Sequence, residues 1–290
     1  MDNMEKAKTA IREIDAQTIS DTVRELCIRS NRILPPDVKT RLEAAQTSES
    51  NPLGREILGD LIENYRLAEQ LDIAVCQDTG TAVVFLELGQ EVHITGGLLA
   101  DAVNDGVARG YTEGFLRCSI AADPLRRVNT QNNTPAVLHT RIVPGDRLTI
   151  TVAPKGAGSE NMSSIKMFTP AAKQQDIMDY VVGCVTAAGS NPCPPVIVGV
   201  GIGGNFEQCA LLAKQALCRS TDIRHPDAFY ADMEAELLTM INATDVGPQG
   251  FGGVCTALAV NIEFAPVHIA SLPVAVNMGC HVTRHQTAVL

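Results

Sequence analysis

The sequence predicts an α/β protein, a mixed two-lobed domain with a helical N-terminal segment. Two patterns indicate this class. Apolar side chains between residues 16 and 72 recur at the helical period, and beyond residue 155 strand-like apolar runs alternate with helical ones. We therefore expect one unit over the whole chain, with a soft boundary near Pro154. Its parts are a helical lead-in (1–72) and two lobes (about 73–154 and 155–290).

The lead-in contains signals for where its helices begin. Ile19, Val23 and Leu26 keep the 3.6-residue spacing of a helix that buries one face. A Pro-Pro pair at 35–36 interrupts this pattern. Asn51 followed by Pro52 predicts an N-cap and a first helical residue, because asparagine accepts from free backbone N–H groups and proline fits the first turn.

The first lobe reads mainly as strands. Strand-like runs cover residues 73–76, 81–88 and 92–95, and a helical pattern follows over 98–115. Alternating side chains on both sides of Pro144-Gly145-Asp146 predict a β-hairpin over 137–154, since this tripeptide is typical of turns.

The second lobe opens with the glycine loop KGAGSENMSS. After it the patterns predict an α/β alternation: helix 173–187, strand 196–202, helices 206–218 and 228–242, and strand 256–263. The run VGVGIGGN invites comparison with a dinucleotide site. Its spacing does not match GxGxxG, and no acidic residue ends a strand some 20 residues later. We interpret it as close helix–strand packing.

Composition excludes several classes of function. The net charge of −10, the pI near 5.1 and the lack of a basic run argue against nucleic-acid binding. Charged and apolar residues alternate through the first 30 positions, and no charge-free apolar stretch could span a bilayer, so we expect a cytoplasmic protein without membrane contact. Nine cysteines, an odd number, are poor evidence for disulfides in a reducing compartment.

The cysteines fall into two groups. Cys76, Cys193 and Cys280 lie in turns beside polar residues, proline or glycine, where a thiol can point into a cleft. From the residues alone they are either metal ligands or buried apolar groups. Those in apolar helical patterns fit plain burial, and two more leave the choice open; these are Cys27, Cys184, Cys209 and Cys218, then Cys118 and Cys255.

Three polar residues could carry chemistry, each with a structural alternative. Asp78 in CQDTG is a possible base or a turn cap, and the lack of a second DTG argues against an aspartic protease. Arg117 could clamp a carboxylate or interact with a helix C-terminus. His268 could be an acid/base group or a core residue.

The strings CQDTG and NPCPP, with His268 twelve residues before Cys280, resemble the α subunit of class I iron–sulfur fumarate hydratases, with L-tartrate dehydratases as neighbours. The resemblance runs from about Glu25 to Arg284. It implies a [4Fe-4S] cluster held by Cys76, Cys193 and Cys280. The fourth iron would have no protein ligand and would act as a Lewis acid.

The resemblance also implies roles for other residues. Asp78 and His268 would be catalytic, and Gln77 and Arg117 would bind a dicarboxylate substrate. Gly156 and Gly158 would line the same site through their backbone N–H groups. The family's second set of substrate-binding residues has no counterpart here, so we expect a separate β subunit and an α2β2 assembly.

The expected activity is reversible hydration of fumarate to L-malate, a tricarboxylic acid cycle reaction. L-Tartrate dehydration is the alternative within the same chemistry, because the substrates differ by one hydroxyl group. An iron–sulfur electron carrier or a zinc-stabilised structural subunit are options of other classes. Both usually use closely spaced cysteine pairs, which this sequence lacks.

Overall fold

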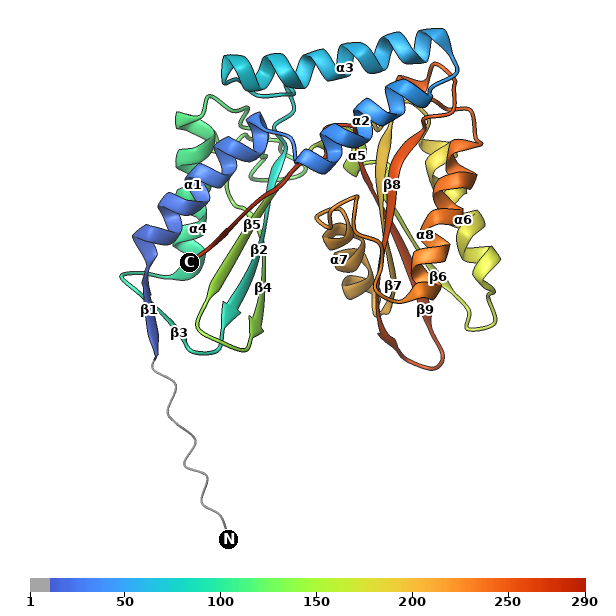
Figure 1. The fold of residues 1–290 in the computed structure, drawn as a ribbon. Coiled ribbons are helices and arrows are strands. Elements are labelled where there is room, and N and C mark those ends of the chain that lie inside the picture. Colours follow the sequence, from blue (N-terminus) through green and yellow to red (C-terminus); the bar gives the residue numbers. More distant parts are fainter. Residues whose placement is uncertain (1–10) are drawn as a thin grey trace. The chain divides into compact units, whose positions relative to one another are not determined.

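The computed structural model describes residues 11–290, and the chain folds into two compact units (Figure 1). Unit 1 comprises residues 11–31, 79–154 and 285–290. Unit 2 comprises residues 32–78 and 155–284. Both contain helices and sheets, which confirms the α/β class. Residues 1–10 of the expected lead-in lie outside the described residues, and the rest of that segment divides between the units.

Unit 1 combines a four-stranded sheet with two helices. The sheet order is β10-β5-β2-β4, and β1 pairs with β3 in a separate two-stranded sheet. The elements are β1 (Arg12–Asp15), α1 (Ala16–Arg32, whose last residue belongs to unit 2), β2 (Thr81–Gly89), β3 (Val92–Thr95), α4 (Leu99–Glu113), β4 (Val137–Val143), β5 (Leu148–Lys155, whose last residue also belongs to unit 2) and β10 (Gln286–Val289).

The predicted hairpin of residues 137–154 is wrong, because β2 lies between β4 and β5. β2 runs parallel to β4, and beyond its end Gln90 N donates to Val143 O at 2.7 Å. The turn after Val143 therefore crosses the end of β2. Burial explains this order: the apolar residues of β2 are buried and belong in the middle of the sheet, whereas β4 is mostly exposed. The predicted strand 73–76 is also wrong; these residues form a loop.

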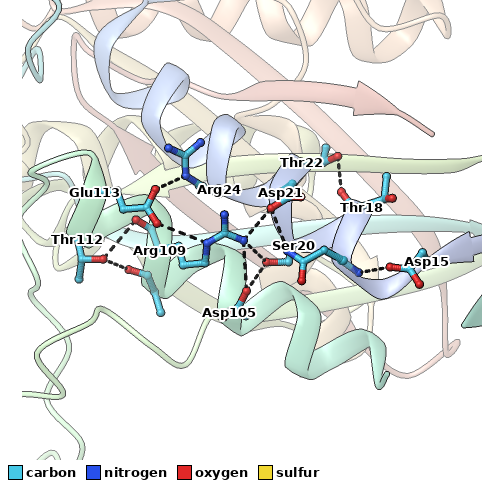
Figure 2. A network of polar contacts seen from close by, with 12 residues as sticks. Asp15, Thr18, Ser20, Asp21, Thr22, Arg24, Asp105, Arg109, Thr112 and Glu113 are labelled. Atoms are coloured by element: carbon cyan, nitrogen blue, oxygen red, sulfur yellow. Dashed lines mark hydrogen bonds and ion pairs between the residues drawn. The ribbon is translucent and has the colours of Figure 1, made fainter. Parts of the chain in front are cut away.

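Ion pairs join α1 to α4 in unit 1 (Figure 2). The guanidinium of Arg109 in α4 lies 2.7 Å from the carboxylate of Asp21 in α1. It also lies 3.6 Å from the carboxylate of Asp105, one turn earlier in α4. Arg24 pairs with Glu113 at the other end of the contact. Hydrogen bonds from Arg109 and then Gln17 lower the pKa of Asp21. These exposed pairs fix the register of the two helices more than they add stability.

Unit 2 is built on a four-stranded sheet of order β6-β9-β7-β8, in which β7 runs parallel to β8 and antiparallel to β9. The Asn51 cap is confirmed, since its Oδ1 accepts from Leu53 N at 3.0 Å. The elements are α2 (Pro36–Ser48), α3 (Pro52–Leu71), α5 (Ala157–Glu160), β6 (Ser164–Phe168), α6 (Gln174–Ala188), β7 (Val196–Gly204), α7 (Phe206–Ala216), α8 (Ala228–Asn242), the 3-10 helix η1 (Pro248–Gly250), β8 (Ala257–Val267) and β9 (Leu272–Gly279).

The two faces of β7 meet different helices. Val198 and Val200 pack with α6 and α8 in the largest core cluster. On the other face a Cβ at Gly201 would lie 2.1 Å from the carbonyl oxygen of Cys209, and one at Gly199 equally close to that of Ala213. Both glycines are needed because the backbone of α7 lies directly on the strand. The expected helix–strand packing is confirmed.

No helix within residues 11–290 combines the length and the apolar character that a membrane span needs.

Candidate active site

Three cysteine loops meet at one end of the unit 2 sheet. Cys193 precedes β7 and Cys280 follows β9. The antiparallel pairing of Ile197 with Gly279 brings both cysteines to the same end of these strands. His281 N donates to Cys193 O at 3.3 Å, which joins the two loops directly. Cys76 follows α3 and packs with Cys280 against one core cluster. We call Cys76, Cys193 and Cys280 the thiol site.

Electrostatics shows that these thiols affect one another. Burial raises the pKa of Cys193, and the neighbouring Cys280 and Cys76 raise it further. Burial also raises the pKa of Cys280, whereas the nearby cations Arg284 and Lys155 oppose this increase. Cys27 differs, because burial alone raises its pKa to about 12. The expectation that Cys27 is an inert apolar residue agrees with this environment.

The donor set of the thiol site fits an iron–sulfur cluster, since three thiols converge there. Within residues 11–290 no group of three or more His, Cys, Asp or Glu side chains is close enough to hold a single metal ion. Thiolates of one four-iron cube bind different irons and lie farther apart than the ligands of one ion. The spacing of the three thiols need not match that of a single-ion site to fit a cluster of this kind.

The Cys193 loop is held in an uncommon conformation. Cys193 has φ of 55°, in the left-handed region that non-glycine residues rarely adopt. Gln249 of η1 donates from its backbone N at 2.8 Å and from Nε2 at 2.6 Å to Pro194 O. His281 Nδ1 lies 3.0 Å from Cys193 O. Strained backbone held by surrounding contacts is typical of functional sites.

Asp78 is anchored by the glycine loop of unit 2. Its Oδ2 accepts from Ala157 N at 2.8 Å, and its backbone oxygen accepts from Arg284 Nη2 at 2.8 Å. A Cβ on Gly156 would lie only 3.0 Å from the same Oδ2. Asp78 is therefore held by residues far away in sequence, and its carboxylate lies two residues after Cys76. Beside it, the Cys76 thiol points to Gln77 Oε1 at 3.5 Å.

The segment from Lys155 to Glu160 touches the other two cysteine loops as well. A Cβ on Gly158 would lie 3.5 Å from the carbonyl oxygen of Asn191, two residues before Cys193. Glu160 Oε2 accepts from Asn277 Nδ2 at 3.1 Å, three residues before Cys280. The structure thus places Gly156 and Gly158 beside the thiol site.

Arg117 belongs to unit 1, where it is tied to Thr79, the residue after Asp78 in sequence. Thr79 Oγ1 accepts from Arg117 N at 2.9 Å and donates to Arg117 O at 3.2 Å. The buried Tyr111 hydroxyl donates to Thr79 O at 2.8 Å and lies 3.1 Å from Gly80 O. Asn133 Nδ2 adds a bond to Gly80 O at 3.0 Å. These contacts leave the Arg117 side chain exposed and able to bind an anion.

His268 is not near the thiol site of its own chain. It lies in the connection between β8 and β9, directly after Val267, which pairs with Gly204 at the far end of β7. The thiol site adjoins the opposite end, at Ile197. Seven residue steps from Ile197 to Gly204 correspond to roughly 20 Å of strand. Figure 1 shows the connection between β8 and β9 at the end of the sheet away from α5.

Comparison with known proteins identifies the family. The model of the family described as "Fumarate hydratase (Fumerase)" matches residues 20–289. The chain belongs to the fumarate hydratase family. A protein of Methanocaldococcus jannaschii, provisionally named L(+)-tartrate dehydratase subunit alpha, is 39% identical over 272 residues, which cover 92% of this chain and 95% of that protein.

Bacterial members of the fumarate hydratase family are also similar to the chain. The L(+)-tartrate dehydratase subunit alpha of Escherichia coli K12 is 30% identical over 258 residues, or 88% of this chain and 84% of the relative. The protein of the same name from Shigella boydii matches to the same extent. Dehydratases are hydro-lyases, so the resemblance noted from the motifs is confirmed at the level of the family.

Several residues of the site were given no individual role from the sequence. Arg284, Lys155 and Glu160 surround the Cys280 loop, while His281 and Gln249 hold the Cys193 loop. The sequence offers a weak signal for Lys155 and Glu160, because both flank the glycines singled out above. For Gln249, 56 residues after Cys193, it offers none.

Proposed function

We propose that this chain is the α subunit of a hydro-lyase that uses a [4Fe-4S] cluster to hydrate fumarate reversibly to L-malate. The observation that carries the proposal is the convergence of Cys76, Cys193 and Cys280 beside Asp78, in a member of the fumarate hydratase family. Those three cysteines would hold the cluster. When bound, it would supply an iron without a protein ligand, which acts as a Lewis acid toward a substrate oxygen.

The chain's own groups would bind the substrate and move a proton. Arg117 would bind one substrate carboxylate through its two parallel N–H groups. The Gln77 amide would donate to a substrate oxygen. Asp78, anchored at Ala157 N, would take the proton from C3 of malate and return it in the hydration direction. Backbone N–H groups near Gly156 and Gly158 would add donors for the second carboxylate.

The remaining substrate contacts would come from a β subunit, which the name "subunit alpha" of the relatives implies. We assign His268 to the same reaction as an acid/base group. Since it lies roughly 20 Å from the thiol site along its own sheet, it would act on the site of a second copy of the chain. An α2β2 assembly would provide that copy.

Dehydration of L(+)-tartrate is the second candidate, favoured by the names of the relatives. Malate and tartrate differ by one hydroxyl group. A pocket with a donor or acceptor placed for that hydroxyl would discriminate strongly between them.

The test is anaerobic co-production of the chain with its β subunit, followed by assays on fumarate, L-malate and L(+)-tartrate. Substitution of Cys76, Cys193 or Cys280 by serine should remove the bound iron and the brown colour. Cys27→Ser and Cys209→Ser, both in buried helical positions, should retain them. Full iron content in the three loop variants would contradict the proposed ligands. Turnover of tartrate alone would select the second candidate.

A further inference from the structure

A buried lysine lies beside the thiol site. The side chain of Lys155 is 11% exposed, and its Nζ is 3.1 Å from Glu160 Oε2. It also donates to Ser159 Oγ at 2.8 Å. A lysine so far removed from water loses hydration, and burial accordingly lowers the pKa of Lys155 while Glu160 raises it. Burying an ammonium group costs free energy unless the charge is paired and hydrogen-bonded.

The partner does not neutralise the group. Glu160 also pairs with Lys214, so two ammonium groups share one carboxylate. The formal charge of these three side chains together is +1. Burial would raise the pKa of Glu160, but Lys155 and Lys214 outweigh it and hold the value at about 2. The carboxylate therefore stays ionised near neutral pH.

The positive charge is directed toward the cysteine loops. Gly156, the residue after Lys155, packs on Asp78 of the Cys76 loop. Glu160 is bound to Asn277, three residues before Cys280. Asn277 Oδ1 is buried without a partner at the same place, so this part of the site is polar and shielded from water.

We propose that Lys155 is a positioning residue for the iron–sulfur cluster, whose buried ammonium adds positive charge beside the Cys76 and Cys280 loops and raises the reduction potential of the cluster. The inference rests on the proposed function in that it requires the cluster. Three thiolates in a partly buried site repel one another and lose hydration, and a fixed cation offsets both effects. The net charge around an iron–sulfur cluster is one of the determinants of its potential.

A purely structural role for Lys155 makes a different prediction. If the pair only ties the Lys155 side chain to Glu160 of α5, removing either partner should weaken the protein in the same way. If the charge acts on the cluster, the two partners should have opposite effects. Lys155→Met removes a positive charge and should lower the potential. Glu160→Gln removes a negative charge and should raise it, because added positive charge favours the reduced cluster.

The experiment uses the anaerobically purified complex with the β subunit. Iron per chain is measured first, and the midpoint potential is then determined by titration with electron paramagnetic resonance of the reduced cluster. We expect lower iron retention and a lower potential for Lys155→Met, a higher potential for Glu160→Gln and near-native values for Lys155→Arg. Lys166→Met is the matched control, since Lys166 is exposed on β6 and lies over the Phe168 ring at 4.4 Å.

Equal potentials in the wild-type and Glu160→Gln complexes would overturn the inference, as would shifts of the same sign in Lys155→Met and Glu160→Gln. Glu160→Gln decides the question even if Lys155→Met does not fold. A wild-type complex without iron would instead overturn the proposed function. The two failures are therefore distinguishable.

Discussion

Thr79 and Arg117 hold each other's backbones from both sides. One hydroxyl group, Thr79 Oγ1, accepts from Arg117 N at 2.9 Å and donates to Arg117 O at 3.2 Å. Thr79 is 2% exposed, so water cannot replace these bonds. One buried hydroxyl therefore holds both backbone groups of Arg117, the residue that carries the candidate carboxylate clamp.

Replacing that hydroxyl should weaken substrate binding. Thr79→Val keeps the shape of the side chain but leaves Arg117 N without its partner, at a cost of about 1–3 kcal/mol, and leaves Arg117 O with only the longer bond from Ser119 Oγ at 3.5 Å. We expect KM for the dicarboxylate to rise several-fold with little change in kcat. Thr47→Val, at an exposed helical threonine whose hydroxyl bonds Glu43 O, is the control. An unchanged KM would show that Thr79 does not position Arg117 for binding.

Arg117 and Asp78 should give separable phenotypes. Arg117→Lys loses the bidentate geometry and should raise KM, whereas Asp78→Asn loses the base and should lower kcat while the cluster spectrum stays intact. Steady-state kinetics and absorption spectra of the anaerobic complex measure both, with Arg126→Lys as a control on the same surface segment. Equal, mild effects would indicate that both residues only hold turns.

The two site glycines should differ in tolerance. Gly156→Ala places a Cβ 3.0 Å from Asp78 Oδ2, closer than most real contacts, so the carboxylate must move. Gly158→Ala meets its nearest atom at 3.5 Å, an ordinary contact. We expect at least a tenfold loss of kcat in the first variant and near-native kcat in the second. Comparable activity of the two would argue against the anchored position of Asp78 as the active one.

Glu160 predicts how stability changes in acid. Its pKa in the folded chain is about 2, below the ordinary value of 4.5, so unfolding takes up a proton between these values. The contribution is fully present above pH 4.5 and is lost as the pH falls toward 2. Urea denaturation at pH 5 and pH 3 should show a smaller acid-induced loss for Glu160→Gln than for the wild type. An identical loss would show that Glu160 does not contribute.

The position of His268 predicts complementation between copies of the chain. His268→Ala and Cys280→Ser should each be inactive when prepared alone with the β subunit. Mixed assemblies should regain activity, because one site would combine an intact thiol site with His268 from the other copy. Differently tagged chains allow the mixed species to be purified and assayed. Mixed assemblies without activity would exclude a His268 contribution from a second copy.

Local signals were sufficient for much of the fold. The period of α3 and its Asn51-Pro52 start are encoded within a few residues, and the same is true of the paired glycines of β7 that admit α7. The hairpin prediction failed for the opposite reason. The turn after Val143 has the same local chemistry whether its two strands pair or enclose a third, and the choice depends on the buried β2.

The site shows the same limit. The cysteines and Asp78 stand in motifs that resemble a known family, so they could be named from the sequence. The contact between Asn277 and Glu160 spans 117 residues, and no periodicity encodes it. The place of His268 depends on strand register in β7, β8 and β9. The twelve-residue spacing between His268 and Cys280 does not reveal that β9 lies between them and places them at opposite ends of the sheet.

The left-handed backbone at Cys193 sets protein stability against chemistry. A residue with a side chain in this conformation costs of the order of 1 kcal/mol or more, and glycine would adopt it freely. Selection for a stable apo chain alone would therefore favour glycine at position 193. Selection for the thiol keeps the less stable residue, so a sequence evolved or engineered only for heat resistance would be drawn toward losing this cysteine.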